Sequence, residues 1–166
     1  SGGVVSAFET VWSVLATLTP VTAADETKLR PLTRWLRERG RLATGHEYAL
    51  AMATLQAAAR RILVDLVEYD AVLTPTLAMP PVAVGALRDD ADPARDFDNQ
   101  KRFTPFTSVA NLTGQPAITL PLGVTPTGLP IGVMLAGRPA GEAGLLALAG
   151  QLEAARPWID RHPECW

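Results

Sequence analysis

The sequence has little cysteine and lysine and no long hydrophobic run. These features argue against an intrachain disulfide, a nucleic-acid partner and a membrane span. Cys165 is the only cysteine in 166 residues, so no disulfide forms within the chain, and a reducing, cytoplasmic location is expected. Arginine supplies all but two of the 15 basic residues, and the net charge of −2 gives no reason to expect a nucleic-acid partner. No apolar run approaches the roughly 20 residues that span a bilayer, so no membrane partner is expected.

The composition that remains is typical of a globular protein. Hydrophobic residues make up 48% of the sequence, and its length suits one domain with a buried core. We therefore interpret residues 1–166 as a single domain or a fragment of one, with residues 1–3 as a cloning remnant. Residues 11–24 loosely resemble a secretory signal. They follow Glu9 and have neither an initiator Met nor a positive leader before them, which favours an internal helix.

Apolar spacing predicts three helices in the first half of the chain. Acidic residues near Asp25 favour the start of the second helix, and Gly40 is predicted to end it. Thr44 with Glu47 three residues later is a capping-box pattern, which predicts the start of the third helix. The predicted helices cover about 5–18, 25–40 and 44–68.

The second half predicts strands, a long loop and two more helices. Residues 75–104 carry many prolines and acids, so we expect a loop there that is mobile over 86–100. Thr104 is predicted to cap a helix that reaches about Leu112 and stops at Gly114. Strands are predicted at 71–74, 117–124 and 131–136, the last two joined as a hairpin, and a final helix at about 141–155.

Several blocks of sequence, in this order along the chain, resemble the C-terminal part of the amidase signature family of hydrolases. The blocks are YDAVLTPT at 69–76, FTPFT at 103–107, NLTGQPAITLP at 111–121, GLPIGVMLAG at 128–137, and residues 142–156. Any one block alone would be weak, but their order makes the resemblance specific. It extends from about Leu32 to Trp158.

The resemblance implies an α/β fold in which a mixed sheet is flanked by helices. It also implies hydrolysis of carbon–nitrogen bonds in amides, without a cofactor. In the family a serine attacks the amide carbonyl, and a second serine with a cis peptide relays its proton to a lysine. That lysine must be neutral to act as a base, so burial has to lower its pKa.

The catalytic groups of the family have no match in this sequence. The Gly/Ser-rich signature that carries the nucleophile is absent, and none of the serines (Ser1, Ser6, Ser13 and Ser108) lies in a glycine-rich Ser-Ser context. Lys28 lies on a polar helix face and Lys101 in the acidic segment, so both are expected to be solvated. We therefore assign no catalytic residue, and the chain is predicted to be inactive alone.

A substrate-binding role is implied for a smaller set of residues. By resemblance, Thr74, Pro75, Thr76, Leu77 and Phe106 approach the substrate. A strand end that leads into a proline-fixed loop is also a usual place for a ligand cleft in α/β folds. The alternative is that both threonines bond the local backbone and that Phe106 is a core residue.

No metal site is expected from the histidines or the aspartates. His46 and His162 lack Cys or carboxylate partners at ligand spacing. The aspartates around Asp90 lack the turn glycine and the closing glutamate of a calcium loop.

These observations predict the C-terminal part of an amidase, which completes the fold and the substrate channel. Its expected partners are the N-terminal catalytic part of the same enzyme and a small-molecule amide. Its nearly continuous apolar strands would otherwise be left uncovered, which favours self-association as a homodimer. A stand-alone binding or interaction module, and a subunit of an amidotransferase-like assembly, remain alternatives.

Overall fold

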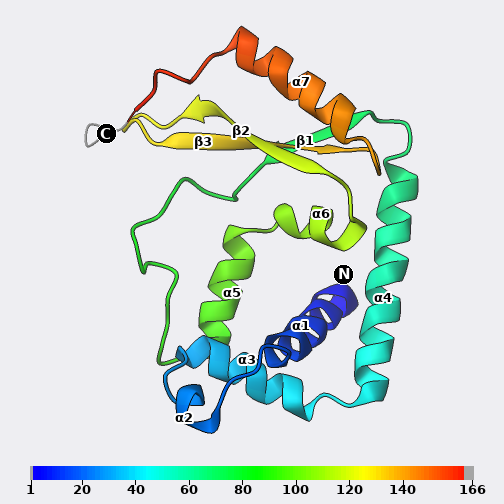
Figure 1. Ribbon diagram of the computed structural model, residues 1–166, viewed down its shortest axis with the longest axis vertical. Helices are drawn as coiled ribbons and strands as arrows, with labels where there is room; N and C mark the ends of the chain where they lie inside the picture. The colour runs from blue at the N-terminus through cyan, green and yellow to red at the C-terminus, as the bar shows by residue number, and fades with distance from the viewer. Residues whose placement is uncertain (1, 163–166) are drawn as a thin grey trace. The chain divides into compact units, whose positions relative to one another are not determined.

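The computed structural model describes residues 2–162, so the predictions for Ser1 and Cys165 lie outside it. Its contacts group the chain into two compact units. The helical unit comprises the residues up to 62 together with 83–102, and the sheet unit comprises 63–82 and the residues from 103 onward. Figure 1 labels the elements of both. Whether residues 1–166 form a single domain stays a prediction.

Five helices belong wholly or mainly to the helical unit, and the early ones follow the predicted spacing. They are α1 (Gly2–Thr17), α2 (Ala23–Glu26), α3 (Pro31–Leu42), α4 (Gly45–Asp65) and α5 (Pro93–Phe103). The capping box at the start of α4 is confirmed. The Glu47 carboxylate accepts hydrogen bonds from the Thr44 N–H and hydroxyl, and the Glu47 N–H donates back to Thr44 Oγ1.

The single helix predicted over 25–40 is wrong, because the chain breaks between α2 and α3. Pro31 occupies the first turn of α3, and Arg30 before it is extended, with φ −59° and ψ 150°. A proline disfavours the helical region for the residue that precedes it, so a new helix begins at Pro31. The Glu26 carboxylate at the end of α2 still reaches α3, where it accepts a hydrogen bond from Arg37 (2.9 Å).

Gly40 does not end α3, which continues to Leu42. Gly40 is buried against α1 instead, and a Cβ placed on it would lie 2.1 Å from the Ser13 carbonyl oxygen. Its lack of a side chain therefore allows the backbones of α1 and α3 to approach each other closely. The sequence pattern marked the right residue but assigned it the wrong role.

A helix, α5, occupies part of the predicted loop over 75–104, and that prediction is wrong for residues 93–103. The Asp92 carboxylate accepts a hydrogen bond from the Arg95 N–H (3.1 Å), and Pro93 follows as the first helical residue. An aspartate followed by proline is a usual helix start, although by composition the pair is equally typical of a loop. Phe97 of α5 joins Leu32 and Leu36 of α3 in the core of the unit.

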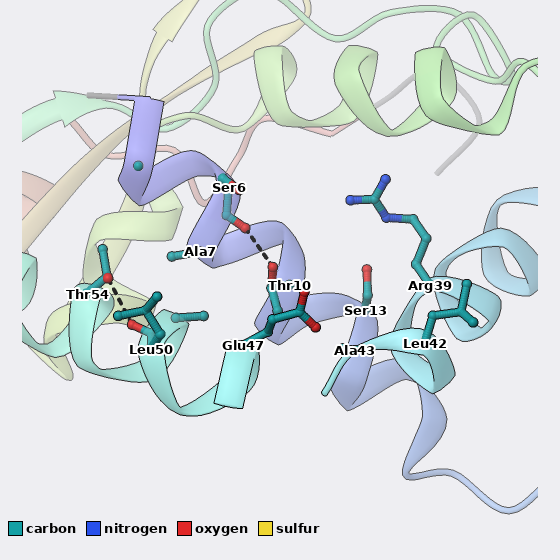
Figure 2. A pocket seen from close by; sticks show the side chains of 12 residues that line it. Ser6, Ala7, Thr10, Ser13, Arg39, Leu42, Ala43, Glu47, Leu50 and Thr54 are labelled. Carbon is teal, nitrogen blue, oxygen red and sulfur yellow. Dashed lines mark hydrogen bonds between the residues drawn. The ribbon is translucent and has the colours of Figure 1, made fainter. Parts of the chain in front are cut away.

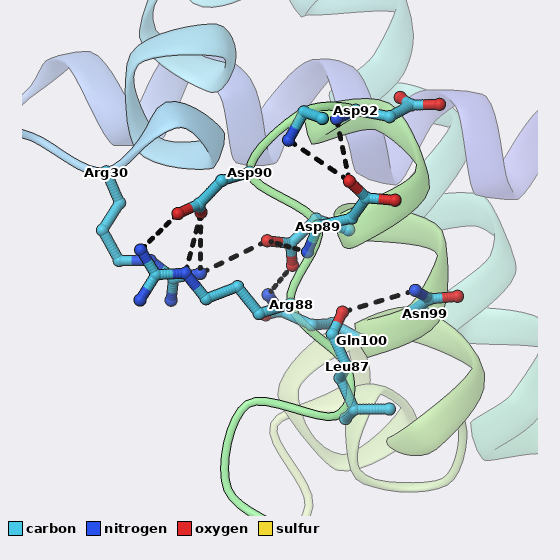
Figure 3. Close-up of polar contacts among 10 residues, drawn as sticks. Arg30, Leu87, Arg88, Asp89, Asp90, Asp92, Asn99 and Gln100 are labelled. Carbon is cyan, nitrogen blue, oxygen red and sulfur yellow. Dashed lines mark hydrogen bonds and ion pairs between the residues drawn. The ribbon is translucent and has the colours of Figure 1, made fainter.

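Asp96 of α5 is the fully buried acid of the helical unit, with 0% of its surface exposed. Its carboxylate accepts hydrogen bonds from the Gln100 amide (2.6 Å) and the Asp89 N–H (3.2 Å), and it pairs with Arg30 (3.3 Å). Figure 3 shows the surrounding polar contacts. There the hydrogen bond from Arg88 holds the pKa of Asp90 below its ordinary value. Acidic residues of the segment predicted to be mobile thus make hydrogen bonds and ion pairs, and its mobility stays a prediction.

Replacing Asp96 by asparagine is expected to lower the free energy of unfolding of the helical unit by about 2 kcal/mol, because hydrogen bonds to a charged group are lost. Urea denaturation of the variant measures this change. The matched control is Asp90→Asn, whose ion pairs are exposed and screened by solvent and are therefore expected to contribute little to stability. Equal stability of the two variants would contradict a stabilising role for the buried carboxylate.

The sheet unit confirms the predicted α/β class. Strands β1 (Ala71–Pro75), β2 (Ala117–Val124) and β3 (Pro130–Gly137) form an antiparallel sheet in the order β1-β3-β2. The hairpin between β2 and β3 is confirmed, and Gly128 takes a positive φ of 87° in its turn. A register shift between Leu120 and Gly123 spans Pro121, which cannot donate to the ladder.

Two helices complete the sheet unit, α6 (Thr107–Thr113) and α7 (Glu142–Ala155). Gly114 ends α6 in the left-handed region with φ 71°, as predicted, but α6 begins at Thr107 instead of directly after Thr104. Figure 1 shows α7 lying across one face of the sheet. Its Leu145 and Ala149 pack there against Leu120 and Leu135.

Candidate functional site

The predicted site residues at the end of β1 stay tied to the sheet. Thr74 and Pro75 are the last residues of β1 and pair with Met134 and Val133 of β3. The Thr76 N–H donates to the Gly132 carbonyl (3.0 Å), so the pairing continues past the strand end. The backbone of this segment is therefore held in a defined position.

Three threonines lie on the sheet face opposite α7, and we call Thr74, Thr76 and Thr119 the threonine cluster. The Thr76 hydroxyl donates to the Thr119 hydroxyl (3.2 Å). Thr119 and Thr74 are both register partners of Met134, so their side chains lie on the same face of the sheet as Met134. The next residue of β3, Leu135, packs against α7, and neighbouring residues of a strand point to opposite faces. Thr119 was not predicted from the sequence; its signal was the alternation of polar and apolar residues along β2.

The cluster depends on a glycine in β3. A Cβ on Gly132 would lie 2.7 Å from Thr76 Oγ1 and 2.9 Å from Thr119 Cγ2. Gly132 therefore leaves the space in which these two side chains meet. The Thr74 hydroxyl oxygen is buried and has no hydrogen-bond partner among residues 2–162. A buried hydroxyl without a partner is energetically costly.

The other two predicted residues, Leu77 and Phe106, lie on neighbouring segments. The Ala78 N–H, directly after Leu77, donates to the carbonyl of Phe103, the last residue of α5 (3.1 Å). This hydrogen bond holds the segment after Leu77 beside the connection between α5 and α6. Phe106 directly precedes α6 and is half-buried. The alternative interpretation required the Thr76 hydroxyl to bond the local backbone, but this hydroxyl donates to the Thr119 hydroxyl instead. A substrate-binding role for these five residues stays a prediction.

Both lysines of the chain are paired with acids. Lys28 is exposed and contacts Asp25 at 2.8 Å. Lys101 pairs with Glu9 of α1 and lies 2.6 Å from Asp98. Partial burial acts to lower the pKa of Lys101, but its hydrogen bonds to Asp98 and Glu9 outweigh this effect and raise it. This shift favours the charged ammonium, which is the opposite of what a lysine base needs.

The described serines are not arranged as nucleophiles. The Ser108 hydroxyl donates to the Pro105 carbonyl (2.8 Å) on its own turn. Ser13 is 2% exposed and its hydroxyl has no partner among the described residues, whereas Ser6 is exposed. Within the part of the chain that the structure describes, no hydrogen bond joins a serine to either lysine.

A pocket of about 560 Å³ lies in the helical unit, lined by α1, the end of α3 and the start of α4 (Figure 2). Most of its polar groups are already engaged. The Thr10 and Thr54 hydroxyls donate to carbonyls of their own helices, and Glu47 caps α4. Ser13 contributes the unpartnered hydroxyl described above. None of the predicted substrate-binding residues lines this pocket.

Clusters of metal-ligating side chains are absent from the described part of the chain. Across residues 2–162, no three or more His, Cys, Asp or Glu side chains gather in a way that could hold a metal ion. No helix in that range is long and apolar enough to cross a membrane.

Comparison with known proteins gives a consistent result. The Amidase family model matches residues 8–146. The Mycobacterium tuberculosis protein named "Putative amidase AmiC" is 41% identical over 139 residues, which are 83% of this chain and 29% of that protein. Its Mycobacterium leprae counterpart is 38% identical over 134 residues, which are 81% of this chain and 28% of that protein.

Solved structures agree with the sequence matches. The structure of 6-aminohexanoate cyclic dimer hydrolase is similar with a TM-score of 0.76 and 28% identity, covering 87% of this chain and 31% of that one. A crystal structure described as an amidase has a TM-score of 0.76 at 23% identity, which shows the fold; the match covers 92% of this chain and 35% of that one. The chain spans less than a third of the length of the AmiC proteins and of the cyclic dimer hydrolase. It belongs to the amidase signature family.

Proposed function

We propose that this chain is the C-terminal portion of an amide hydrolase, in which it completes the fold and shapes the substrate channel. The observation that carries the proposal is the threonine cluster, which the fold builds beside the proline-fixed end of β1. Family membership supports the reaction class. The match covers only 29% of the AmiC protein, which supports the proposal that this chain is a portion of a longer enzyme.

The threonine cluster suits an amide in chemical terms. An amide group offers one carbonyl acceptor and, when not fully substituted, an N–H donor. Threonine hydroxyls donate and accept, so Thr74 and Thr76 can satisfy both ends of that group.

The nucleophile and the base are proposed to come from the N-terminal catalytic part of the same enzyme. The raised pKa of Lys101 and the exposed ion pair of Lys28 support this division, since an amidase lysine has to be neutral. Exposed apolar residues also support a covering partner: Leu73 of β1 is 64% exposed. A cytoplasmic location belongs to the same proposal.

The test replaces the matching segment of AmiC by this chain and measures amide hydrolysis by the chimera. The double variant Thr76→Val/Thr119→Val keeps the shape of both side chains and removes the hydroxyl pair. We expect its KM to rise about tenfold, with a smaller change in kcat, because one hydrogen bond to substrate is lost.

The matched control is Thr54→Val, whose hydroxyl bonds its own helix. It is expected to leave both kinetic constants at the values of the unmodified chimera. An unchanged KM for the double variant, in a chimera that hydrolyses amides, would contradict the role of the threonine cluster.

A further inference from the structure

The hydrogen bond within the threonine cluster has a direction, and this direction separates the roles of its two partners. The Thr76 hydroxyl donates its proton to Thr119 Oγ1 (3.2 Å). A threonine hydroxyl has a single proton, so Thr76 has none left for a second acceptor. Thr119 keeps its own proton, and its hydroxyl donates to no acceptor among residues 2–162. The remaining donor of the pair is therefore Thr119.

Thr119 is also the partner that a ligand can reach. Its side chain is exposed, whereas Thr76 is half-buried. The residues of β2 on either side of it, Ile118 and Leu120, belong to the core that packs against α7. Thr119 therefore points away from that core, because neighbouring residues of a strand point to opposite faces of the sheet. A molecule on the sheet face opposite α7 meets this hydroxyl at the surface.

Thr76 reaches Thr119 across the middle strand of the sheet. The strand order is β1-β3-β2, so the backbones that carry the two threonines lie about 10 Å apart, which is two strand spacings. Their side chains meet over Gly132 of β3, where a Cβ would lie 2.7 Å from Thr76 Oγ1. The Thr76 N–H donates to the Gly132 carbonyl (3.0 Å), which holds its backbone beside this gap. A hydroxyl oxygen that accepts a hydrogen bond in this way is polarised and donates its own proton more strongly.

We propose that the Thr119 hydroxyl donates a hydrogen bond to the carbonyl oxygen of the amide substrate, with Thr76 as a positioning residue that orients and polarises it. The inference rests on the proposed function and names the donor within that site. A carbonyl oxygen offers lone pairs and no proton, so it is the part of an amide that matches a hydroxyl whose oxygen already accepts a hydrogen bond.

The test measures KM and kcat of the AmiC chimera with Thr119→Val, Thr76→Val or both. Thr119→Val removes the donor and is expected to raise KM about tenfold, with kcat changed less than about twofold. Thr76→Val keeps the donor and removes the group that orients it, so KM is expected to rise about threefold. The double variant should match Thr119→Val alone, because Thr76 has nothing to position once the donor is gone.

Two further variants separate the hydroxyl from the rest of the side chain. Thr119→Ser keeps the hydroxyl and removes the methyl group, so most of the affinity lost in Thr119→Val should return. The matched control is Thr127→Val, which breaks another exposed hydroxyl pair, formed with Thr125 (2.9 Å) in the turn between β2 and β3. This control should leave both kinetic constants at the values of the unmodified chimera.

The outcomes distinguish this inference from the proposed function. If KM rises in the double variant and not in Thr119→Val alone, or if Thr76→Val has the larger effect, the assignment of Thr119 is wrong and the threonine cluster keeps its role. An unchanged KM in the double variant would contradict both. A readout without activity is the Thr76 χ1 rotamer, measured by NMR three-bond couplings in the isolated chain. One rotamer is expected there, with averaging in Thr119→Val, and averaging in the unmodified chain would overturn the positioning role.

Discussion

Replacing Gly40 by alanine is expected to lower the free energy of unfolding of the helical unit by about 3 kcal/mol, at the upper end of the usual cost of overpacking. The new Cβ would lie 2.1 Å from the Ser13 carbonyl oxygen and 2.6 Å from its carbonyl carbon. Both atoms belong to the backbone of α1, so no side-chain rotation relieves the overlap. The helices would have to separate, which would also disturb the packing of Phe8 and Ala16 against Leu32 and Leu36.

Alanine favours helix over glycine by about 1 kcal/mol, which offsets part of this loss. Gly150→Ala isolates that contribution, because Gly150 lies within α7 and a Cβ there would meet nothing within 4 Å. Urea denaturation of the two variants should therefore shift stability in opposite directions. A Gly40→Ala variant as stable as the parent would show that α1 and α3 are not in close contact at this glycine.

The sequence was informative where a local signal fixes the backbone. The Thr44–Glu47 capping box, the hairpin turn at Gly128 and the helix end at Gly114 each depend on residues close together in the chain. Such signals predicted these elements correctly. The signals of Gly40 and of the aspartate–proline start of α5 were local too, but each was compatible with two structures.

What the sequence could not predict depends on contacts between distant residues. Gly40 meets Ser13 on another helix, and Asp96 meets Arg30, 66 residues away. The predicted Thr74–Leu77 segment was located correctly at the end of β1, but Thr119 joins it only through the strand register.

The chain by itself is expected to hydrolyse no amide above the rate of a protein-free blank. Removing either the nucleophile or the base from a serine hydrolase costs several orders of magnitude in rate. Here Lys101 is held in its charged form by Glu9 and Asp98, and Ser108 donates to its own turn. A panel of aliphatic and aryl amides, assayed by release of ammonia or amine, would detect any turnover.

The most direct test of the proposed role compares initial rates of amide hydrolysis by the isolated chain and by the AmiC chimera that contains it. Unmodified AmiC identifies the amides of the panel that can be used. We expect no turnover by the isolated chain and turnover by the chimera on the same amide. Hydrolysis by the isolated chain that persists through repurification and is lost in Ser108→Ala would contradict the proposal that the catalytic groups lie outside this chain.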